Sequence, residues 1–309
     1  MSKIDIPHYH ETIHWLLQSQ TPSIRYLTMT RVLGMAEDDA EVSSTRQSIP
    51  ISPPVEGILA AQHPEGYWER AKNIYSPKYR SSHWSMLLLV ELGLEVRNPQ
   101  LQRGAEFILQ VIEKNPPHYL TRREIGLGCF WGNWLRYQLY CGRGVSPLVQ
   151  EVIDFVCEDI QRGGQCRYNW NLPCAWGVAR GLYGLALIPE NQRSASVRKA
   201  LDMGIRFFLE EYDLVKANFP PRNRKHPLWN KLSFPLYYQA DRLFVLRILK
   251  ELKALEHPKA QEALTWLSSK QTKAGIWRGG SPFKSSRPFL AGTEGVERWI
   301  TLHALEVLL

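Results

Sequence analysis

The stretch Pro147-Leu-Val-Gln-Glu-Val-Ile-Asp-Phe-Val156 has two counterparts that align with it without gaps, Pro99-Gln-Leu-Gln-Arg-Gly-Ala-Glu-Phe-Ile108 and Pro258-Lys-Ala-Gln-Glu-Ala-Leu-Thr-Trp-Leu267. In all three copies, apolar residues stand two, six and nine positions after the proline. Steps of three and four residues place them on one face of a helix. Proline suits the first helical turn, where its missing N–H is not needed. Each copy therefore predicts an amphipathic helix that begins at its proline.

Each of these helices follows another helical run after a short break, and extending the count predicts six helical pairs. We expect the first members near residues 10–18, 53–62, 100–113, 147–161, 196–211 and 258–270. We expect the second members near residues 23–34, 82–94, 129–141, 174–187, 236–254 and 296–309. No run of residues alternates with β-branched enrichment, so the sequence predicts no strand.

The second members are apolar nearly all round, as in Trp84-Ser-Met-Leu-Leu-Leu-Val90 and Leu302-His-Ala-Leu-Glu-Val-Leu-Leu309. A helix of this kind is buried on every side, whereas an amphipathic helix keeps one face in water. The second members therefore form an inner ring and the first members an outer ring. The predicted fold class is all-α, as an α/α toroid of six helical hairpins, in a single domain over residues 1–309.

A turn motif ends two of the outer helices: Gln62-His-Pro-Glu-Gly-Tyr-Trp68 and Gln271-Thr-Lys-Ala-Gly-Ile-Trp277 share the pattern Gln-x-x-x-Gly-x-Trp. A shorter third copy, Gln161-Arg-Gly-Gly-Gln-Cys166, has Cys in place of Trp. Glycine ends a helix in a left-handed turn. We expect the Gln side chain to bond the freed backbone groups and the Trp ring to pack back over the turn.

Hairpin repeats with these turns resemble the prenyltransferase/squalene–oxidosqualene cyclase repeat family, which includes terpenoid cyclases and the β-subunits of protein prenyltransferases. The resemblance covers residues 10–309. It implies a terpenoid cyclase-like or isomerase-like enzyme that acts on an apolar or cationic small molecule. The sequence departs from the family in its catalytic motifs, because Asp-x-Asp-Asp and the Asp-x-Cys of the transferases are absent. Its nearest approach to Asp-Asp-x-x-Asp is Glu37-Asp-Asp-Ala-Glu41, in a polar linker.

In a toroid, the loops that enter the inner helices surround one mouth of the central cavity. Long loops on a rigid scaffold are where function concentrates. Aromatic residues stand at the starts of nearly all these helices and are candidates to line a cup for an apolar or cationic guest. They are Trp84, Trp131, Trp134, Trp176, Tyr237, Tyr238 and Trp299. The alternative for each is core packing between the two rings.

Two residues are candidates for proton transfer in this cup, Asp241 and His83. Asp241 is expected inside an apolar inner helix, where a carboxylate needs a partner or a raised pKa. An ion pair with Arg180 or Arg298 is the alternative for Asp241, and a satisfied core histidine is the alternative for His83. Glu294 and Glu297 are candidates for a second carboxylate; the alternative is a favourable interaction with the helix dipole.

Cys129, Cys166 and Cys174 precede or begin successive inner helices. Three thiolates with His83 or Asp241 would make a tetrahedral zinc site. The resemblance implies the same possibility, since protein prenyltransferases and lanthionine synthetases hold zinc in such toroids, although the Cys-His-Gly of the latter is absent. The alternative is that free cysteines pack as small hydrophobic residues.

The segment 214–231 is basic and aromatic, with Lys216, Arg222, Arg224, Lys225, His226, Trp229 and Lys231. Together with Lys78, Arg80, Arg122 and Arg123, it predicts a positive rim that suits a phosphate group on the ligand; a solvated rim is the alternative. The net charge of +8 agrees with an anionic partner. The cationic residues are too scattered for a dedicated nucleic-acid binder.

The amino-acid composition excludes several classes of protein. Hydrophobic residues make up 44% of the 309 positions, which is enough for a large core. No apolar run approaches the roughly 20 residues of a membrane span, and the first residues do not resemble a signal peptide. Five widely spaced cysteines do not form a disulfide framework, so we expect a cytoplasmic protein. Two functions stand beside the enzyme: a toroid that binds a peptide or lipid without catalysis, and a zinc-dependent prenyltransferase-like transferase.

Overall fold

The computed structural model describes residues 6–115, 127–217, 226–282 and 295–309. Regular structure in these residues is helical, with only isolated bridges and no strand, which confirms the all-α class. None of the helices in these ranges has the length and apolarity needed to cross a bilayer. The helices are α1 (His10–Leu17), α2 (Pro22–Leu27), α3 (Ala40–Gln47), α4 (Val55–Ala60), α5 (Ser82–Glu91), α6 (Pro99–Lys114), α8 (Gly128–Tyr140), α9 (Pro147–Gln161), α10 (Ala175–Leu185), α11 (Ala195–Arg206), α12 (Arg242–Glu251), α13 (Pro258–Ser268) and α14 (Val296–Leu308).

The three aligned prolines each begin a helix, as predicted: α6 at Pro99, α9 at Pro147 and α13 at Pro258. Before α6, the side chain of Asn98 accepts hydrogen bonds from the backbone N–H groups of Gln100 and Leu101, at 3.0 and 3.1 Å. These bonds satisfy two of the donors that a helix leaves free at its start. Local sequence therefore fixes the first turn of this helix.

Two elements differ from the prediction. Helix α3 forms in the segment that was expected to be a linker, and the Asp39 carboxylate caps it by accepting from the N–H of Glu41 at 2.9 Å. Helix α12 begins at Arg242 instead of residue 236. The mostly apolar residues just before it, 233–240, form a non-helical segment with a turn at residues 237 and 238. We call this segment the strap, and Asp241 after it is the N-cap of α12. The expectation that Asp241 lies inside a helix is therefore wrong.

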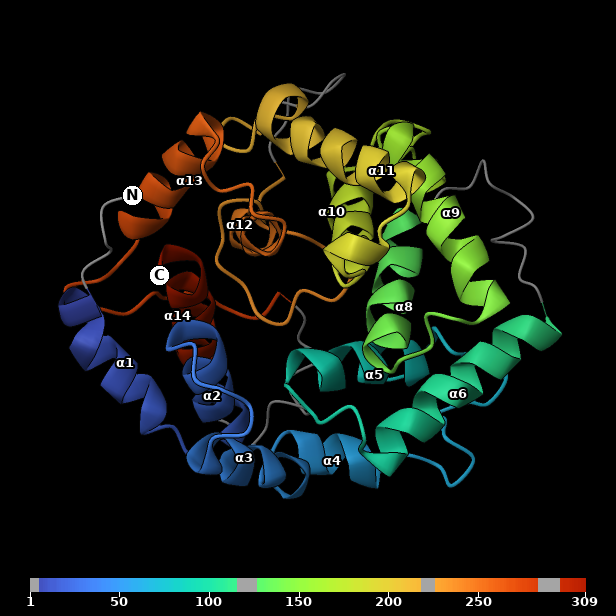
Figure 1. Cartoon of the computed structure of the whole chain (residues 1–309), viewed down its shortest axis with the longest axis horizontal. Helices are drawn as coiled ribbons and strands as arrows, with labels where there is room; N and C mark the ends of the chain where they lie inside the picture. Colours follow the sequence, from blue (N-terminus) through green and yellow to red (C-terminus); the bar gives the residue numbers. More distant parts are fainter. Residues whose placement is uncertain (1–5, 116–126, 218–225, 283–294) are drawn as a thin grey trace.

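Figure 1 shows the helices in two concentric rows around the short axis of the molecule. Helices α2, α5, α8, α10, α12 and α14 lie toward the middle, and α1, α3, α4, α6, α9, α11 and α13 lie outside them. Neighbouring middle helices pack on one another: α5 on α8, α8 on α10, α10 on α12, α12 on α14 and α14 on α2. Every residue of α5 is buried, as an apolar middle helix requires.

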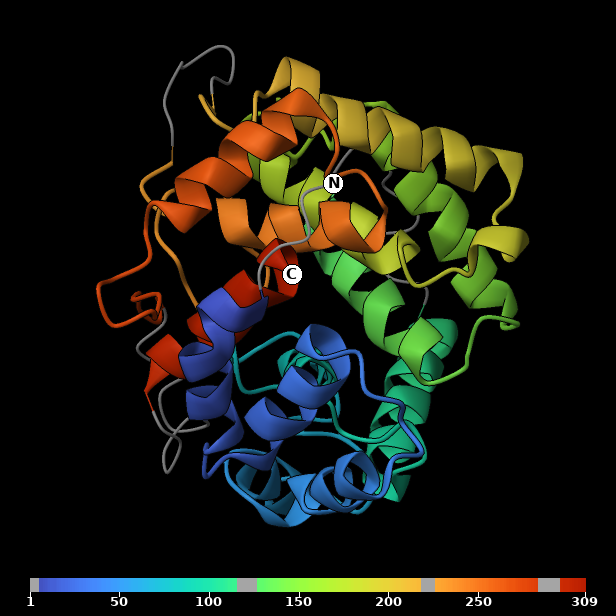
Figure 2. The same cartoon turned by 60° about the vertical axis from the view of Figure 1, so that its left-hand side comes forward.

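The first and last helices of the chain lie side by side, as Figures 1 and 2 both show. The Thr12 hydroxyl in α1 donates to the carbonyl oxygen of Gly275 at 3.0 Å. The Arg31 guanidinium, just after α2, lies 3.5 Å from the Glu306 carboxylate in α14. The Arg298 side chain also donates to the carbonyl oxygen of Trp15. Contacts between the two ends of the chain thus join α1 and the segment after α2 to α14 and to the turn at Gly275.

The two Gln-x-x-x-Gly-x-Trp turns have the geometry that the sequence predicts. Gly66 and Gly275 have φ angles of 101° and 77°, in the region that favours glycine. The Gln62 side chain donates to the Gly66 carbonyl at 3.2 Å, and the Gln271 side chain donates to that of Gly275 at 2.9 Å. The indole of Trp68 packs back over its turn, donating to the Ile58 carbonyl at 2.6 Å.

The same turns also join the outer row to the inner row. The backbone N–H of Trp68 donates to the Ser82 hydroxyl at the start of α5, at 3.0 Å. The backbone N–H of Trp277 donates to the Thr301 hydroxyl in α14, also at 3.0 Å. Both indoles are fully buried. Each motif therefore stops an outer helix and ties the following loop to an inner helix.

Candidate functional site

Four partly exposed aromatic rings from three separate segments meet at or just before the N-terminal ends of α5, α10 and α12. We call this group the aromatic face; it consists of Tyr75, Tyr79, Trp176 and Tyr238. The rings of Tyr79 and Tyr238 are stacked, with centroids 6.3 Å apart and planes 4° from parallel. The ring of Trp176 meets that of Tyr238 edge-on at 5.8 Å. Such a surface offers both ring faces and ring edges to a flat ligand.

Positive charge lies over this face. The Lys78 ammonium is 5.0 Å from the ring centroid of Tyr238 and 5.7 Å from that of Tyr75. Both distances lie within the range of a cation–π interaction. The exposed His226 ring is 4.8 Å from the ring of Trp176. Apolar surface and a cation are thus presented together, in a pattern that suits an apolar molecule with an anionic group.

The aromatic face rests on a fully buried layer. The Trp84 indole donates to the Tyr75 carbonyl at 2.8 Å, which fixes the loop that carries Tyr75 and Tyr79. The His83 ring stacks on Phe130 with centroids 4.5 Å apart. Because side chains in this layer are packed against one another, they position the partly exposed rings above them.

His83 is a buried neutral base. Its Nδ1 lies 3.1 Å from the Tyr137 hydroxyl, and its Nε2 has no hydrogen-bond partner in the described structure. Burial, with a smaller effect of the Arg180 charge, lowers the pKa of His83 to about 3. The ring therefore stays uncharged near neutral pH, and solvent does not reach it. His83 is thus a core histidine, as the alternative states, but only one of its two ring nitrogens is satisfied.

Both carboxylate oxygens of Asp241 accept hydrogen bonds from the backbone. One carboxylate oxygen accepts from the backbone N–H of Phe244 at 2.8 Å, and the other accepts from that of Ser233 at 3.0 Å. Burial raises the pKa of Asp241 to about 7 despite these bonds. The Arg180 and Arg298 side chains donate to backbone carbonyls, and neither pairs with Asp241. The carboxylate joins the strap to the start of α12.

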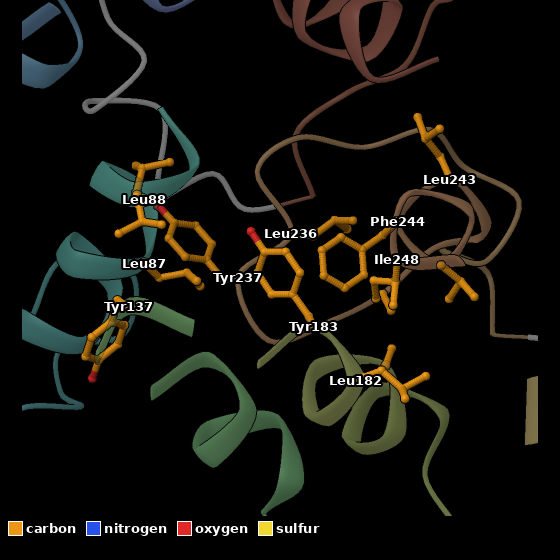
Figure 3. Packing of buried hydrophobic residues seen from close by; sticks show 14 of the residues in the cluster. Leu87, Leu88, Tyr137, Leu182, Tyr183, Leu236, Tyr237, Leu243, Phe244 and Ile248 are labelled. Atoms are coloured by element: carbon orange, nitrogen blue, oxygen red, sulfur yellow. The ribbon is translucent and has the colours of Figure 1, made fainter. Parts of the chain in front are cut away.

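Most of the other predicted cup residues are interior. Trp84, Trp131, Trp134, Tyr237 and Trp299 have at most 1% of their surface exposed. Only Trp176 and Tyr238 of the predicted set keep part of their surface in solvent. Figure 3 shows Tyr237 and Tyr183 lying between the leucines of α5 and Phe244 of α12. The packing alternative therefore describes the five buried rings, and the exposed face is smaller than the predicted cup.

The strap is held by two polar residues of the inner helices. The Asn133 amide in α8 donates to the Tyr237 carbonyl at 2.9 Å. The Arg180 guanidinium in α10 donates to the Gln239 carbonyl at 2.7 and 3.1 Å, and its carbon lies 3.9 Å from the ring centroid of Phe244. Burial lowers the pKa of Arg180 to about 10, which leaves it charged at neutral pH. These bonds fix Tyr238 at the surface.

The three candidate zinc ligands lie in one region but do not form a metal site as placed. Cys129 interacts electrostatically with Cys174, Cys166 and the buried Asp159. Burial raises the pKa of Cys174 to about 11, and that of Cys129 is raised as well, so both are neutral thiols. In the described part of the chain, no group of three or more His, Cys, Asp or Glu side chains is arranged to hold a metal ion.

The predicted positive rim is only partly described. Arg122, Arg123, Arg222, Arg224, Lys225 and Glu294 lie outside the described residues. The Lys216 ammonium is 3.9 Å from the Asp213 carboxylate, and Arg80 pairs with Glu69 at 2.8 Å. Trp229 is buried, with its indole donating to the Leu214 carbonyl at 3.1 Å, so it does not belong to a rim. Lys78 and His226 are the rim residues that reach the aromatic face.

Sequence reasoning overlooked Tyr75 and Tyr79 as site residues. They stand in the segment Tyr75-Ser-Pro-Lys-Tyr79, within a loop that was expected to reach the mouth. The position of these residues in that loop, with two tyrosines close to a lysine, could have identified them as candidates for the site. Comparisons of the chain with protein-family models, curated proteins and solved structures find no match.

Proposed function

We propose that the chain is an α/α toroid of six helical hairpins, in a single domain. The paired order of α1/α2, α4/α5, α6/α8, α9/α10, α11/α12 and α13/α14 supports this arrangement. The contact of α14 with α2 supports closure of the inner row. Contact between the Gly93 turn after α5 and the Tyr26 ring in α2 supports it at the remaining junction. The two Gln-x-x-x-Gly-x-Trp turns support the further proposal that the chain is related to the cyclase repeat family.

We propose that the toroid binds a small molecule with a flat apolar body and an anionic group. One observation carries this proposal: rings from three hairpins meet around Lys78 on the aromatic face. The body of the ligand would lie against Trp176 and Tyr238, and its phosphate or carboxylate would lie near Lys78 and His226. A cationic ligand fits less well, because Lys78 already occupies the ring faces that would attract it.

Binding without chemistry is the function that this geometry supports best. Cyclase-like or isomerase-like chemistry needs an acid or base within hydrogen-bond reach of the ligand. The two groups predicted for that role are Asp241, whose oxygens accept from backbone N–H groups, and His83, which is buried beneath the face. Neither is available to a ligand on the aromatic face. The proposal therefore assigns recognition to this face and no catalytic residue.

Fluorescence titration with 1-naphthyl phosphate and with uncharged 1-naphthol tests the proposal. Both probes should bind, and Trp176→Ala should weaken both by roughly 3–10-fold, as expected for loss of one aromatic contact. Lys78→Gln should weaken only the phosphate probe. Trp170→Asn is the matched control, because Trp170 is an exposed tryptophan outside the aromatic face. Failure of both probes to bind, or equal affinity in Trp176→Ala and the unchanged protein, would refute the proposal.

A further inference from the structure

The turn formed by residues 166–172 projects two large aromatic side chains into solvent. Tyr168 is 80% exposed and Trp170 is 69% exposed. They are the only aromatic side chains among the large exposed hydrophobic residues of the described ranges. Most surface tryptophans pack at least one ring face on the protein, so two neighbouring aromatic rings with this much exposed surface are unusual.

The turn is rigid in its backbone. The N–H groups of four successive residues, 169–172, donate to carbonyls within the turn, at 2.8–3.1 Å. The Asn169 side chain donates to the Pro173 carbonyl at 2.7 Å, and the Cys166 N–H donates to the Leu172 carbonyl at 3.2 Å. Trp170 and Asn171 both adopt left-handed backbone conformations, with φ of 58° and 57°. The fold therefore holds the two rings outward at a fixed position.

Two arginines lie in the turn and just before it. Arg167 lies in the turn and is exposed, and Arg162 is exposed just before it. No acidic residue occurs between Asp159 and Glu190, and the whole chain carries a net charge of +8. Arginine beside exposed tyrosine and tryptophan is the combination that is enriched where proteins meet the headgroups of anionic lipids.

We propose that the 166–172 turn inserts Tyr168 and Trp170 into the headgroup layer of an anionic lipid bilayer, with Arg167 and Arg162 near the lipid phosphates. Tyrosine and tryptophan suit this layer, because each has an apolar ring and a polar tip. Internal pairing of the turn amides lowers the cost of leaving water. A stable protein partner would need about 800 Å² on this chain, far more than one short turn offers. The proposal does not depend on the ligand of the aromatic face.

Co-sedimentation with phosphatidylcholine vesicles, with and without phosphatidylglycerol, tests this proposal on the full chain. We expect binding to the vesicles that contain phosphatidylglycerol, a blue shift of tryptophan emission on binding, and release by added salt. Trp170→Asn should weaken partitioning about tenfold, in line with removal of one buried aromatic side chain. Asparagine tolerates the left-handed conformation at this position, so the shape of the turn is kept.

Two further variants separate insertion from general charge attraction. Arg167→Gln should weaken binding only to the anionic vesicles, and Val145→Ala should have no effect, although Val145 is 94% exposed. Trp170→Asn should leave the affinity for 1-naphthyl phosphate unchanged, whereas Trp176→Ala should leave vesicle binding unchanged. Absence of vesicle binding, or equal binding by Trp170→Asn and the unchanged protein, would overturn the proposal.

Discussion

Replacement of Gly132 by alanine should destabilise the protein by about 2 kcal/mol, because helices α8 and α10 touch backbone to backbone at this glycine. A Cβ atom at position 132 would lie 2.0 Å from the carbonyl oxygen of Arg180 and 2.5 Å from the nitrogen of Gly181. Ordinary contacts begin at 3.4 Å, so the two helices would have to separate by about 1.4 Å. Overpacking against rigid backbone costs about 3 kcal/mol of stability. The better helix propensity of alanine offsets about 1 kcal/mol of this cost.

Urea unfolding and calorimetry measure this effect against a matched control. Gly57 lies in α4 with no atom within 4 Å of an added Cβ. Gly57→Ala should therefore stabilise the protein by about 0.5–1 kcal/mol, since only the backbone effect remains. The melting temperature should fall by roughly 3 °C in Gly132→Ala and rise by about 1 °C in Gly57→Ala. If the two variants were equally stable, the close contact of α8 and α10 would be refuted.

Three further changes test buried groups. Burial raises the pKa of Asp159 to about 7, so its contribution to stability is present below about pH 4 and is lost as the pH rises to 7. Asp159→Asn should thus gain stability relative to the unchanged protein between pH 5 and pH 8 in urea unfolding, and a constant difference would contradict this. Asp241→Ala should cost about 2–4 kcal/mol, because the α12 cap and the acceptor for the Ser233 N–H are both lost, and Asp241→Asn should cost less. Equal costs for these two variants would argue against the cap. Cys129 and Cys174 should react with iodoacetamide more slowly than an exposed cysteine at both pH 7 and pH 9, because burial raises the pKa of both thiols above 9. Rapid alkylation at pH 7, followed by mass spectrometry, would contradict that environment.

Most of the helices were predictable, because their apolar residues repeat with helical spacing and proline marks three of their starts. The short helix α3 was missed, since Ala40–Gln47 is mostly polar and has little apolar periodicity. Asp39 followed by Glu41 was a usable start signal, because an acidic cap is typical of a helix N-terminus. The hydrophobic pattern alone was thus insufficient to predict a short helix that buries only a few of its residues.

The candidate site was harder to predict, for a physical reason visible at the strap. Residues 236–240 are apolar except for Gln239, and an apolar loop that packs on the core can have the same composition as a buried helix. Their path is set by Asn133 and Arg180, which are 104 and 59 residues from the carbonyls they bind. The spacing of residues along the sequence does not predict hydrogen bonds between such distant positions. The sequence therefore predicted that aromatic residues gather in this region, but it did not predict which of them reach solvent.

The contact between the two ends of the chain has a consequence for synthesis on the ribosome. Thr12 bonds to Gly275, and Tyr9 packs its ring 6.2 Å from that of Trp277. At about 5–20 residues per second, the first hairpin emerges roughly 13–50 s before these partners are made. During that interval, apolar side chains such as Ile13 and Leu16, buried in the finished fold, lack their final cover. The first hairpin therefore reaches its final packing only after the C-terminal part of the chain has been made.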